Sequence, residues 1–343
     1  MKRLWETVNN SILKYDLLVK LYSPIKPHIA TIKALKFPFK ETNVGVAYLK
    51  GRPKEFNDIV EELTADNLSQ FEPPKGSPYI FNSEPCKQAH FSLPLYQYWC
   101  IKMNQAPEFK RKQWEFVYII QCLYERGLLN AVSSGVGFGV GKEPLVSLFA
   151  SKGCDVLATD ISEETGRKLG WVQSDQHTGD SYDPLWIEEI CSRSEFKQRV
   201  SFRHVDMNDI PDDIQSFDFC WSACAFEHLG SIKKGLEFVE KSLRCIKPGG
   251  LAVHTSEYNL SSNENTQDDN PYLVLFRQRD YKKLFERLES AGHKVYPVSF
   301  EPGEGYVDNF VDIPPYYRKN MHLNLLIGKY VTTSFGLVIR KAS

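Results

Sequence analysis

The residues most suited to ligand chemistry begin with a stretch from Ser134 to Pro144, in which every second residue from Gly135 to Gly141 is glycine. Glycine lets the main chain turn sharply, and it lets a ligand approach the backbone closely because no side chain intervenes. A short apolar strand is predicted before this stretch, at 129–133, and a helix with Pro144 in its first turn is predicted after it. The pattern therefore predicts a ligand-binding loop.

The spacing of these glycines excludes two loops that bind phosphate groups. A P-loop needs glycine where Val136 stands, and serine or threonine where Glu143 stands. The dinucleotide fingerprint GxGxxG meets Val140, Lys142 or Pro144 at its last glycine, depending on its starting point. Because Pro144 also removes one N–H donor from the helix start, the remaining GxGxG pattern favours a ligand without a phosphate chain.

Two acidic residues follow the next two predicted strands. Asp160 comes 21 residues after Gly139, at the end of a strand at 155–159, where a carboxylate can reach the two hydroxyls of a ribose. Asp206 ends a strand at 200–205 and is followed by Met207. An acid there can accept a hydrogen bond from an adenine amino group while the methionine covers the ring. The order of loop and acids predicts a nucleoside site.

These residues need a scaffold that brings strand ends together, and the rest of the chain predicts one. Helices are expected at 112–129, 144–151, 231–246 and 280–291, and strands at 44–49, 129–133, 155–159, 200–205, 217–222, 251–254, 294–300 and 330–339. Strand–helix alternation predicts βαβ units and a mostly parallel sheet covered by helices on both faces. The last two strands have no clear helix between them, which predicts an antiparallel edge pair.

The series Gly137–Gly141, Asp160, Asp206-Met207 and Lys247-Pro248-Gly249-Gly250 resembles the class I S-adenosylmethionine-dependent methyltransferases, over about residues 112–343. The resemblance implies a Rossmann-like, doubly wound α/β sheet of seven strands, mostly parallel, whose last strand is antiparallel. It also implies S-adenosylmethionine as cofactor, with the glycine loop around its amino-acid part and Asp160 on its ribose. The cofactor-binding residues implied in this way are Gly137, Phe138, Gly139, Val140, Gly141, Glu143, Asp160, Ile161, Asp206, Met207 and Ser222.

One position departs from the family pattern. The family usually carries an acid two residues before the first glycine of the loop, where it helps to orient the methionyl ammonium. That position is Gly135 if the motif begins at Gly137, or Ser133 if it begins at Gly135. Glu143 is the residue that we expect to supply the missing charge.

Methyl transfer to a weakly acidic hydroxyl needs a general base, and histidine suits this role near neutral pH. His228 is the first candidate and His254 the second, with Glu227 or Glu257 as the orienting group or substrate contact. The alternative for these residues is a metal site built from Cys224, Glu227, His228 and His254. Adjacent residues such as Glu227 and His228 are poorly spaced for joint ligation, so no metal is expected.

The acceptor is predicted by resemblance alone. Segments such as Cys224–Gly230 and His254–Asn259 resemble a bacterial subgroup of these methyltransferases associated with surface polysaccharide assembly, which implies a glycan or nucleotide-linked sugar hydroxyl. Residues 1–111 are predicted to form an irregular N-terminal extension and substrate lid over the domain at 112–343. Aromatic and amide groups at Tyr96–Trp99 would suit a sugar. The alternatives are a small metabolite or lipid acceptor, or a non-catalytic cofactor-binding scaffold; a nicotinamide-dependent oxidoreductase is disfavoured by the failed GxGxxG spacing.

Composition excludes several partners. The 343 residues carry 42 Lys plus Arg against 43 Asp plus Glu, a net charge of −1, which argues against binding nucleic acid or anionic membranes. No apolar run is long enough to span a bilayer, and the N-terminus lacks the apolar core of a signal peptide. The eight scattered cysteines predict reduced thiols in a cytoplasmic protein. Whether the chain forms homo-oligomers is left open.

Overall fold

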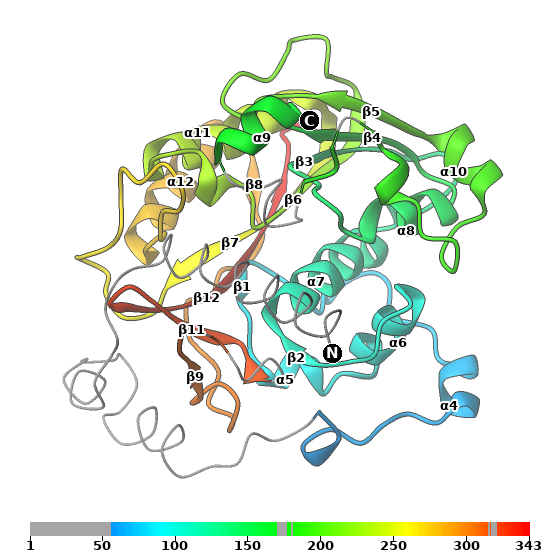
Figure 1. The fold of residues 1–343 in the computed structure, drawn as a ribbon, viewed down its shortest axis with the longest axis horizontal. Coiled ribbons are helices and arrows are strands. Elements are labelled where there is room, and N and C mark those ends of the chain that lie inside the picture. The colour runs from blue at the N-terminus through cyan, green and yellow to red at the C-terminus, as the bar shows by residue number, and fades with distance from the viewer. Residues whose placement is uncertain (1–55, 170–176, 180, 315, 317–320) are drawn as a thin grey trace, which may run out of the picture.

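The computed structural model describes residues 56–169, 177–179, 181–314, 316 and 321–343, and its centre is one large sheet (Figure 1). Five parallel strands stand in the order β5-β4-β3-β6-β7, and β12 joins β7 antiparallel. Their bounds are β3 Ser134–Phe138, β4 Asp155–Asp160, β5 Val200–His204, β6 Phe217–Ala223, β7 Ile246–Asn259 and β12 Tyr330–Arg340. The expected doubly wound, mostly parallel α/β architecture with an antiparallel last strand is confirmed.

The sheet is larger than expected. It has ten strands among the described residues, whereas seven were predicted. The expected set is completed by β8, Lys294–Val295, which pairs with the end of β12. The additional strands are β1 Glu84–Pro85, β9 Val311–Asp312 and β11 Asn324–Ile327; β2 Phe109–Lys110 and β10 Met321–His322 form a separate pair. β11 arises because Gly328, with a φ of +59°, begins a two-residue turn into β12.

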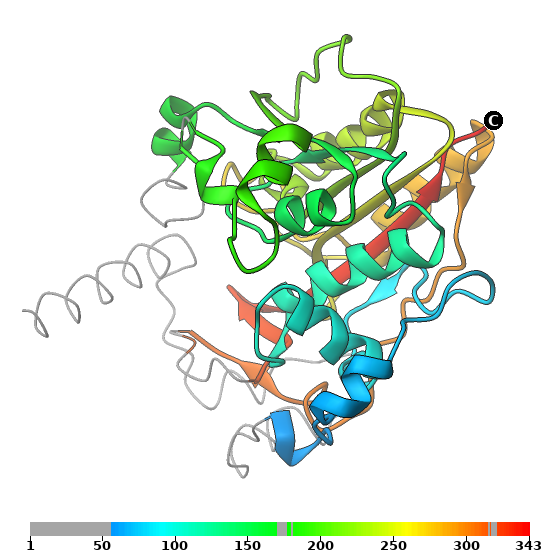
Figure 2. The ribbon, with the colours of Figure 1, turned by 90° about the vertical axis from the view of Figure 1, so that its right-hand side faces the viewer.

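Helices cover both faces of the sheet (Figure 2). One face carries α7 Arg111–Glu125, α8 Leu145–Ser151 and α10 Arg193–Arg199, and the other carries α11 Ile232–Ser242 and α12 Gln278–Ser290. Side chains alternate between the two cores, as successive residues of a strand must. Phe219 and Trp221 of β6 pack with α7 and α8, while Cys220 between them packs with α11. Burial on both faces explains why these strands are almost continuously apolar.

The other described helices are short. They are η1 Phe56–Asp58, α4 Ala65–Gln70, α5 Gln88–Phe91, α6 Pro94–Lys102, α9 Glu163–Leu169, η2 Asp183–Leu185, η3 Phe226–His228 and η4 Leu243–Cys245. None of the helices in the described part of the chain combines the length and the apolar character that crossing a bilayer requires.

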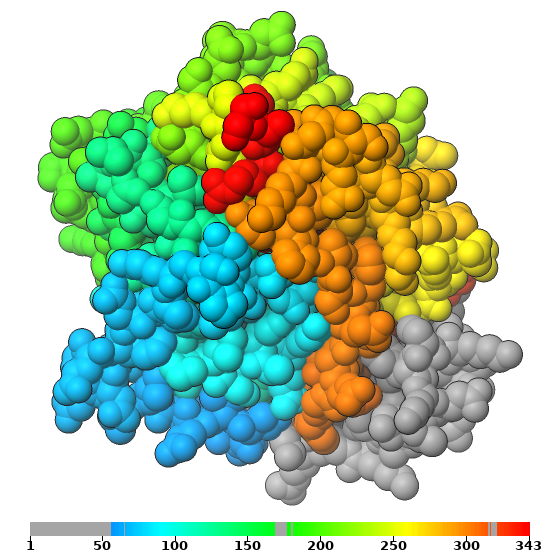
Figure 3. Space-filling model, turned by 180° about the vertical axis from the view of Figure 1, so that it is seen from behind, coloured from blue at the N-terminus to red at the C-terminus, as the bar shows by residue number. Residues whose placement is uncertain are grey.

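The described part of the N-terminal segment, from residue 56, packs beside the chain around residue 300, as the neighbouring blue, cyan and orange surfaces of Figure 3 show. The Ser299 N–H donates to the Ser83 carbonyl at 2.9 Å. Tyr96 and Trp99 are fully buried, so the expectation that these two rings face a sugar is wrong. The strand expected at 44–49 lies outside the described residues, and the lid function of 1–111 stays a prediction.

The glycine stretch is divided between a strand and a turn. The strand predicted at 129–133 begins later, at Ser134, so Gly135 and Gly137 lie inside β3. A Cβ atom on Gly137 would stand 2.3 Å from the Trp221 ring of the neighbouring strand β6, and one on Gly135 would meet the Phe219 ring at the same distance. These two glycines therefore make room for aromatic rings, and the turn itself starts only after Phe138.

Candidate functional site: a cavity at the strand ends

A cavity of about 710 Å³ opens at the carboxyl ends of β3, β4, β5 and β6. The chain runs from β3 to β4 on one side and places β6 on the other side, so the strand order reverses here. In open α/β sheets this reversal is where ligands bind, and the volume is that of a small-molecule site. Nine of the predicted site residues line the cavity: Gly139, Val140, Gly141, Glu143, Asp160, Ile161, Asp206, Met207 and His228.

The turn after β3 approaches the cavity without side chains. Gly139 and Gly141 have left-handed φ values of +62° and +52°, which residues with a Cβ adopt only with strain. A Cβ on Gly139 would lie 2.9 Å from the Cβ of Ala225 and 3.3 Å from the sulfur of Met207. Space for a ligand beside this backbone therefore depends on glycine at 139.

Asp160 is held in place by the backbone around it. The Gly141 N–H donates to Oδ2 at 3.1 Å, and the Ile161 N–H donates to Oδ1 at 2.8 Å. Burial raises the pKa of Asp160, while nearby His177 and these backbone N–H groups oppose the rise. A carboxylate has about four acceptor sites. A third backbone N–H, that of Thr178, also bonds to this carboxylate. The backbone thus fixes the orientation of Asp160 at the cavity and leaves acceptor capacity for a ribose hydroxyl.

Glu143 enters the cavity wall from the turn before α8. The Trp221 indole N–H donates to its Oε1 at 2.6 Å. Burial raises the pKa of Glu143 to about 8, although the Trp221 bond and the charge of Lys112 lower it. A cationic group placed beside it would favour its ionised form. The position fits the charge that the glycine motif lacks.

The ends of β4 and β5 add residues that sequence reasoning did not assign to the cofactor. His177 is buried; its Nδ1 accepts from the Gly179 N–H and its Nε2–H donates to the Ile161 carbonyl, both at 2.8 Å. His204 contacts the same carbonyl through Nδ1 at 3.1 Å. Both histidines line the cavity. His204 stands only two residues before Asp206, so its position could have been inferred from the sequence, whereas no local pattern marks His177.

The wall on the β6 side carries the first candidate base. His228 ends η3, and its Nδ1–H donates to the backbone carbonyl of Tyr272. Burial lowers the pKa of His228 to about 4; the Tyr272 bond opposes the shift, and the positive charges of Lys112 and Arg111 add to it. The imidazole is therefore neutral at pH 7, with Nε2 as its basic nitrogen.

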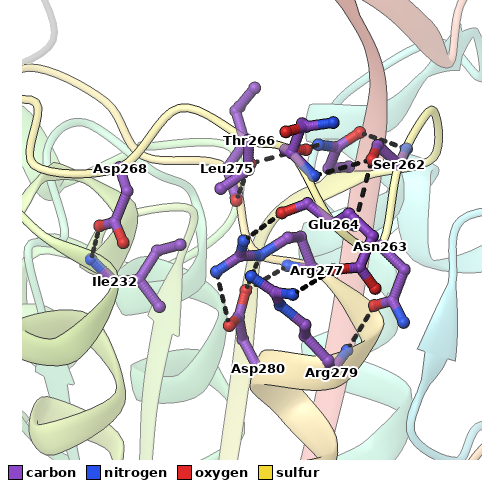
Figure 4. A network of polar contacts seen from close by, with 12 residues as sticks. Ile232, Ser262, Asn263, Glu264, Thr266, Asp268, Leu275, Arg277, Arg279 and Asp280 are labelled. Atoms are coloured by element: carbon purple, nitrogen blue, oxygen red, sulfur yellow. Dashed lines mark hydrogen bonds and ion pairs between the residues drawn. The ribbon is translucent and has the colours of Figure 1, made fainter.

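The segment that supplies the Tyr272 carbonyl is itself well anchored (Figure 4). The Arg277 guanidinium donates to the Glu264 carbonyl at 2.6 Å and to the Asp280 carboxylate. Asp268 accepts from the N–H of Ile232, the first residue of α11, at 2.9 Å. These bonds fix residues 262–280 against the helix that follows His228, so the histidine and its backbone partner keep a constant relation.

Six predicted site residues do not line the cavity: Gly137, Phe138, Ser222, Glu227, His254 and Glu257. His254 is fully buried, and its ring nitrogens share hydrogen bonds with Ser222 Oγ at 2.8 Å and Ser242 Oγ at 3.1 Å. The predicted strand ended at His254, but β7 continues to Asn259. His254 therefore lies in mid-strand rather than at the rim, and its position gives no support to a base function.

The two predicted carboxylates on this side lie behind the wall. Glu257 forms an ion pair with Arg111 and accepts from the Thr332 hydroxyl. Burial and the nearby charge of Glu257 raise the pKa of Glu227 to about 8. Among the residues that the structure describes, no cluster of three potential ligands could hold a metal ion.

Comparison with known proteins relates part of this chain to one family. A family model described as a methyltransferase domain matches residues 136–254. No curated protein matches the sequence significantly. One similar solved structure, described as a sarcosine dimethylglycine methyltransferase of Galdieria sulphuraria, is 15% identical over 67% of this chain and 84% of that chain, with a TM-score of 0.42. The 1,6-didemethyltoxoflavin-N1-methyltransferase of Burkholderia thailandensis is 12% identical over 68% and 80%, with a TM-score of 0.40.

The CurJ carbon methyltransferase is 14% identical over 68% of this chain but only 54% of its own chain, with a TM-score of 0.37. This chain thus spans about half of that protein. Likenesses this distant carry no argument about activity, so the assignment rests on other observations. The matched residues run from β3 into β7 and include the strand ends around the cavity. The match identifies a methyltransferase domain within the chain at residues 136–254, and S-adenosylmethionine is the methyl donor that such a domain implies.

Proposed function

We propose that the protein transfers the methyl group of S-adenosylmethionine to a hydroxyl oxygen, with His228 as general base. The observation that carries this proposal is a neutral imidazole on the cavity wall whose tautomer is set by the Tyr272 carbonyl. When bound, S-adenosylmethionine supplies a methyl group activated by a positive sulfur. The protein's contribution is to hold the two reactants in line, which can be worth roughly 7–11 kcal/mol.

The cavity residues divide into two groups along the sheet. The ends of β4 and β5 present Asp160, Asp206 and Met207, which suit the ribose and the adenine. The turn after β3, with Glu143, suits the amino-acid part. The wall beyond the end of β6 contains His228, and the acceptor belongs on this side because the nucleoside occupies the other.

His228 can act as a base without a preceding deprotonation. Its pKa of about 4 keeps Nε2 unprotonated over the whole physiological range. A base with so low a pKa is weak. Proton transfer to His228 therefore depends on the position of its ring relative to the acceptor rather than on its basicity. The fixed bond from Nδ1 to the Tyr272 carbonyl supplies that position and stabilises the imidazolium that forms.

A sugar hydroxyl, on a glycan or a nucleotide-linked sugar, is the acceptor that we propose. Its support is the sequence resemblance around Cys224–Gly230 and His254–Asn259, and the neutral net charge is compatible with it. The buried Tyr96 and Trp99 offer no support. Small metabolites and lipids are the acceptor classes against which sugars must be compared.

The test is an assay of S-adenosylhomocysteine release with panels of nucleotide sugars, oligosaccharides, small alcohols and lipids. We expect release with at least one hydroxyl acceptor, and a loss of roughly 10²–10⁴-fold in turnover for His228→Ala with S-adenosylmethionine affinity nearly unchanged. His293→Ala, at a half-exposed histidine far along the chain, is the matched control. Equal turnover of His228→Ala and the wild type would refute the base, and S-adenosylmethionine binding without transfer to any acceptor would indicate a scaffold.

A further inference from the structure

Lys112, in the first turn of α7, lies on the acceptor side of the cavity, and sequence reasoning did not single it out. It lines the cavity together with Phe116, Cys224 and His228, and about half of its side chain is accessible. Its ammonium donates to Glu115 Oε2 at 2.9 Å and to the Ala223 carbonyl at 2.8 Å. An ammonium has three N–H donors. Described residues accept two of them, so one remains for a molecule in the cavity.

The partner of Lys112 is built into the core. Glu115 is 1% exposed, and its other oxygen, Oε1, accepts from the Ser334 hydroxyl and from the Cys224 thiol, the latter at 3.0 Å. These two donors occupy Oε1, which leaves Oε2 for Lys112. In an ordinary ion pair between residues three apart on a helix surface, the carboxylate has no such additional donors. The ammonium is held at one place on the wall rather than moving freely in solvent.

The backbone conformation at Cys224 also contributes to the arrangement of Lys112 and Glu115. Its φ is +48°, a left-handed value that is uncommon for a residue with a side chain. The conformation is secured because the Cys224 N–H donates to the Thr255 carbonyl at 3.0 Å and to the Thr255 hydroxyl at 3.1 Å. The turn brings the Cys224 thiol onto Glu115 directly after β6 and before η3, the segment that carries His228.

The charges of the pair persist at neutral pH. Burial opposes ionisation of both groups, but the Lys112 and Arg111 charges lower the pKa of Glu115, and the Glu115 charge raises the pKa of Lys112. Lys112 is therefore a permanent cation that cannot serve as the base. It stands close enough to His228 to help lower the pKa of that histidine. A neutral base and a fixed cation thus share one wall.

We propose that Lys112 is a catalytic residue that binds the reacting oxygen of the acceptor and stabilises the negative charge that develops there. This inference rests on the proposed transfer to a hydroxyl. The acceptor O–H proton moves to His228 Nε2, the oxygen forms a bond to the methyl carbon, and the carbon–sulfur bond breaks with its electron pair left on sulfur. Lys112 donates to the oxygen throughout and is not consumed. Fixed donors aimed at developing charge are among the strongest catalytic devices.

The position of Lys112 also predicts which ligands bind best to this wall of the cavity. A site with a fixed ammonium binds an anionic oxygen better than the neutral hydroxyl that it comes from. An oxyanion of the right size, such as a phenolate, should therefore bind beside the cofactor product even when it is not the natural acceptor.

The experiment uses 4-nitrophenol as the probe, because its neutral and ionised forms have different absorption spectra. It is titrated with pH in the presence of the full-length protein saturated with S-adenosylhomocysteine, for the wild type, Lys112→Met, Lys112→Arg and Lys233→Met. Lys233 is a highly exposed lysine of α11 and serves as the matched control. The affinity of every variant for S-adenosylhomocysteine is measured first, which shows that each is folded.

We expect the wild type and Lys233→Met to bind the phenolate in preference to the phenol, which lowers the apparent pKa of the bound probe. Lys112→Met should lose this preference by roughly tenfold or more, and Lys112→Arg should retain much of it because the charge remains. A lysine that only stabilises α7 would leave the spectrum of the bound probe unchanged on substitution. The proposal is overturned if the wild type shows no preference for the phenolate, or if Lys112→Met keeps it.

The same variants separate this inference from the proposed function. With any hydroxyl acceptor found active, Lys112→Met should lower turnover by roughly 10²-fold, and the acidic limb of its pH profile should move to higher pH because a positive neighbour of His228 is gone. Normal turnover of Lys112→Met would contradict the function of Lys112 while leaving methyl transfer intact. Loss of the phenolate preference in a protein that methylates no hydroxyl would contradict the proposed function instead.

Discussion

His228 and His254 show that a depressed pKa does not by itself identify a base. Burial lowers the pKa of His228 to about 4 and that of His254 to about 3, so both imidazoles are neutral at pH 7. They differ in what surrounds them. His228 reaches the cavity with one nitrogen fixed by a backbone carbonyl, whereas the nitrogens of His254 share bonds with Ser222 and Ser242 in the core. Access to the reacting atoms is what separates the two.

The pH dependence of turnover tests this reading of His228. Because its pKa is lowered, the neutral form that accepts a proton is present above about pH 4 and is lost as the pH falls through that value. We expect kcat to be level near neutral pH and to fall with a midpoint near pH 4. Initial rates of S-adenosylhomocysteine formation, measured under saturation with both substrates, give this midpoint. A midpoint near the ordinary histidine value of about 6.5 would show that the catalytic histidine is not buried in this way.

Replacement of His254 should affect stability and not the site. His254→Ala leaves Ser222 and Ser242 without their buried partner and opens space beside Phe226 and Phe238. We expect a loss of about 2–4 kcal/mol in the free energy of unfolding, with S-adenosylhomocysteine affinity nearly unchanged. Denaturant titration and calorimetry on the same preparation measure the two quantities. A large loss of turnover in a variant that stays folded would return His254 to the candidate bases.

At the scale of elements, the glycines of the stretch 135–141 have two different functions, one inside β3 and the other in the turn that follows it. Gly137 belongs to the strand, where it admits the Trp221 ring; that ring in turn donates to Glu143 at the cavity. Gly139 belongs to the turn, where its left-handed backbone passes Met207 and Ala225. The periodicity of the glycines therefore reflects packing below the site as much as ligand binding within it.

Gly137→Ala tests whether glycine is needed at this position to make room for the Trp221 ring. The added Cβ would stand 2.3 Å from the indole of Trp221, and overpacking of this kind costs roughly 1–3 kcal/mol of stability. Gly127→Ala is a reference for backbone strain without a clash, because a φ of +74° strains alanine although the space around its Cβ position is open. Thermal unfolding should show Gly137→Ala to be the less stable variant. The packing explanation fails if the two variants unfold alike.

Across the whole molecule, sequence reasoning succeeded where local pattern and burial coincide. The strands at 155–159 and 217–222 are apolar because both faces of the sheet are covered, and Asp160 ends the first of them, where the sequence placed it. It failed where tertiary contacts decide. The start of β3 depends on rings from β6, and the length of β7 moved His254 from the rim into the core. Lys112 precedes every motif in the chain, and only the packing of α7 on β6 and β7 brings it to the site.

The central claim is that the cavity at the strand ends binds the adenosyl cofactor through Asp160. Calorimetric titration with S-adenosylhomocysteine tests it directly in the wild type, in Asp160→Ala and in Asp155→Ala, an exposed aspartate at the other end of β4. We predict one binding site in the wild type and in Asp155→Ala, with the affinity of Asp160→Ala weakened by roughly 1–3 kcal/mol. No binding by the wild type, or equal affinity in all three proteins, would contradict the account.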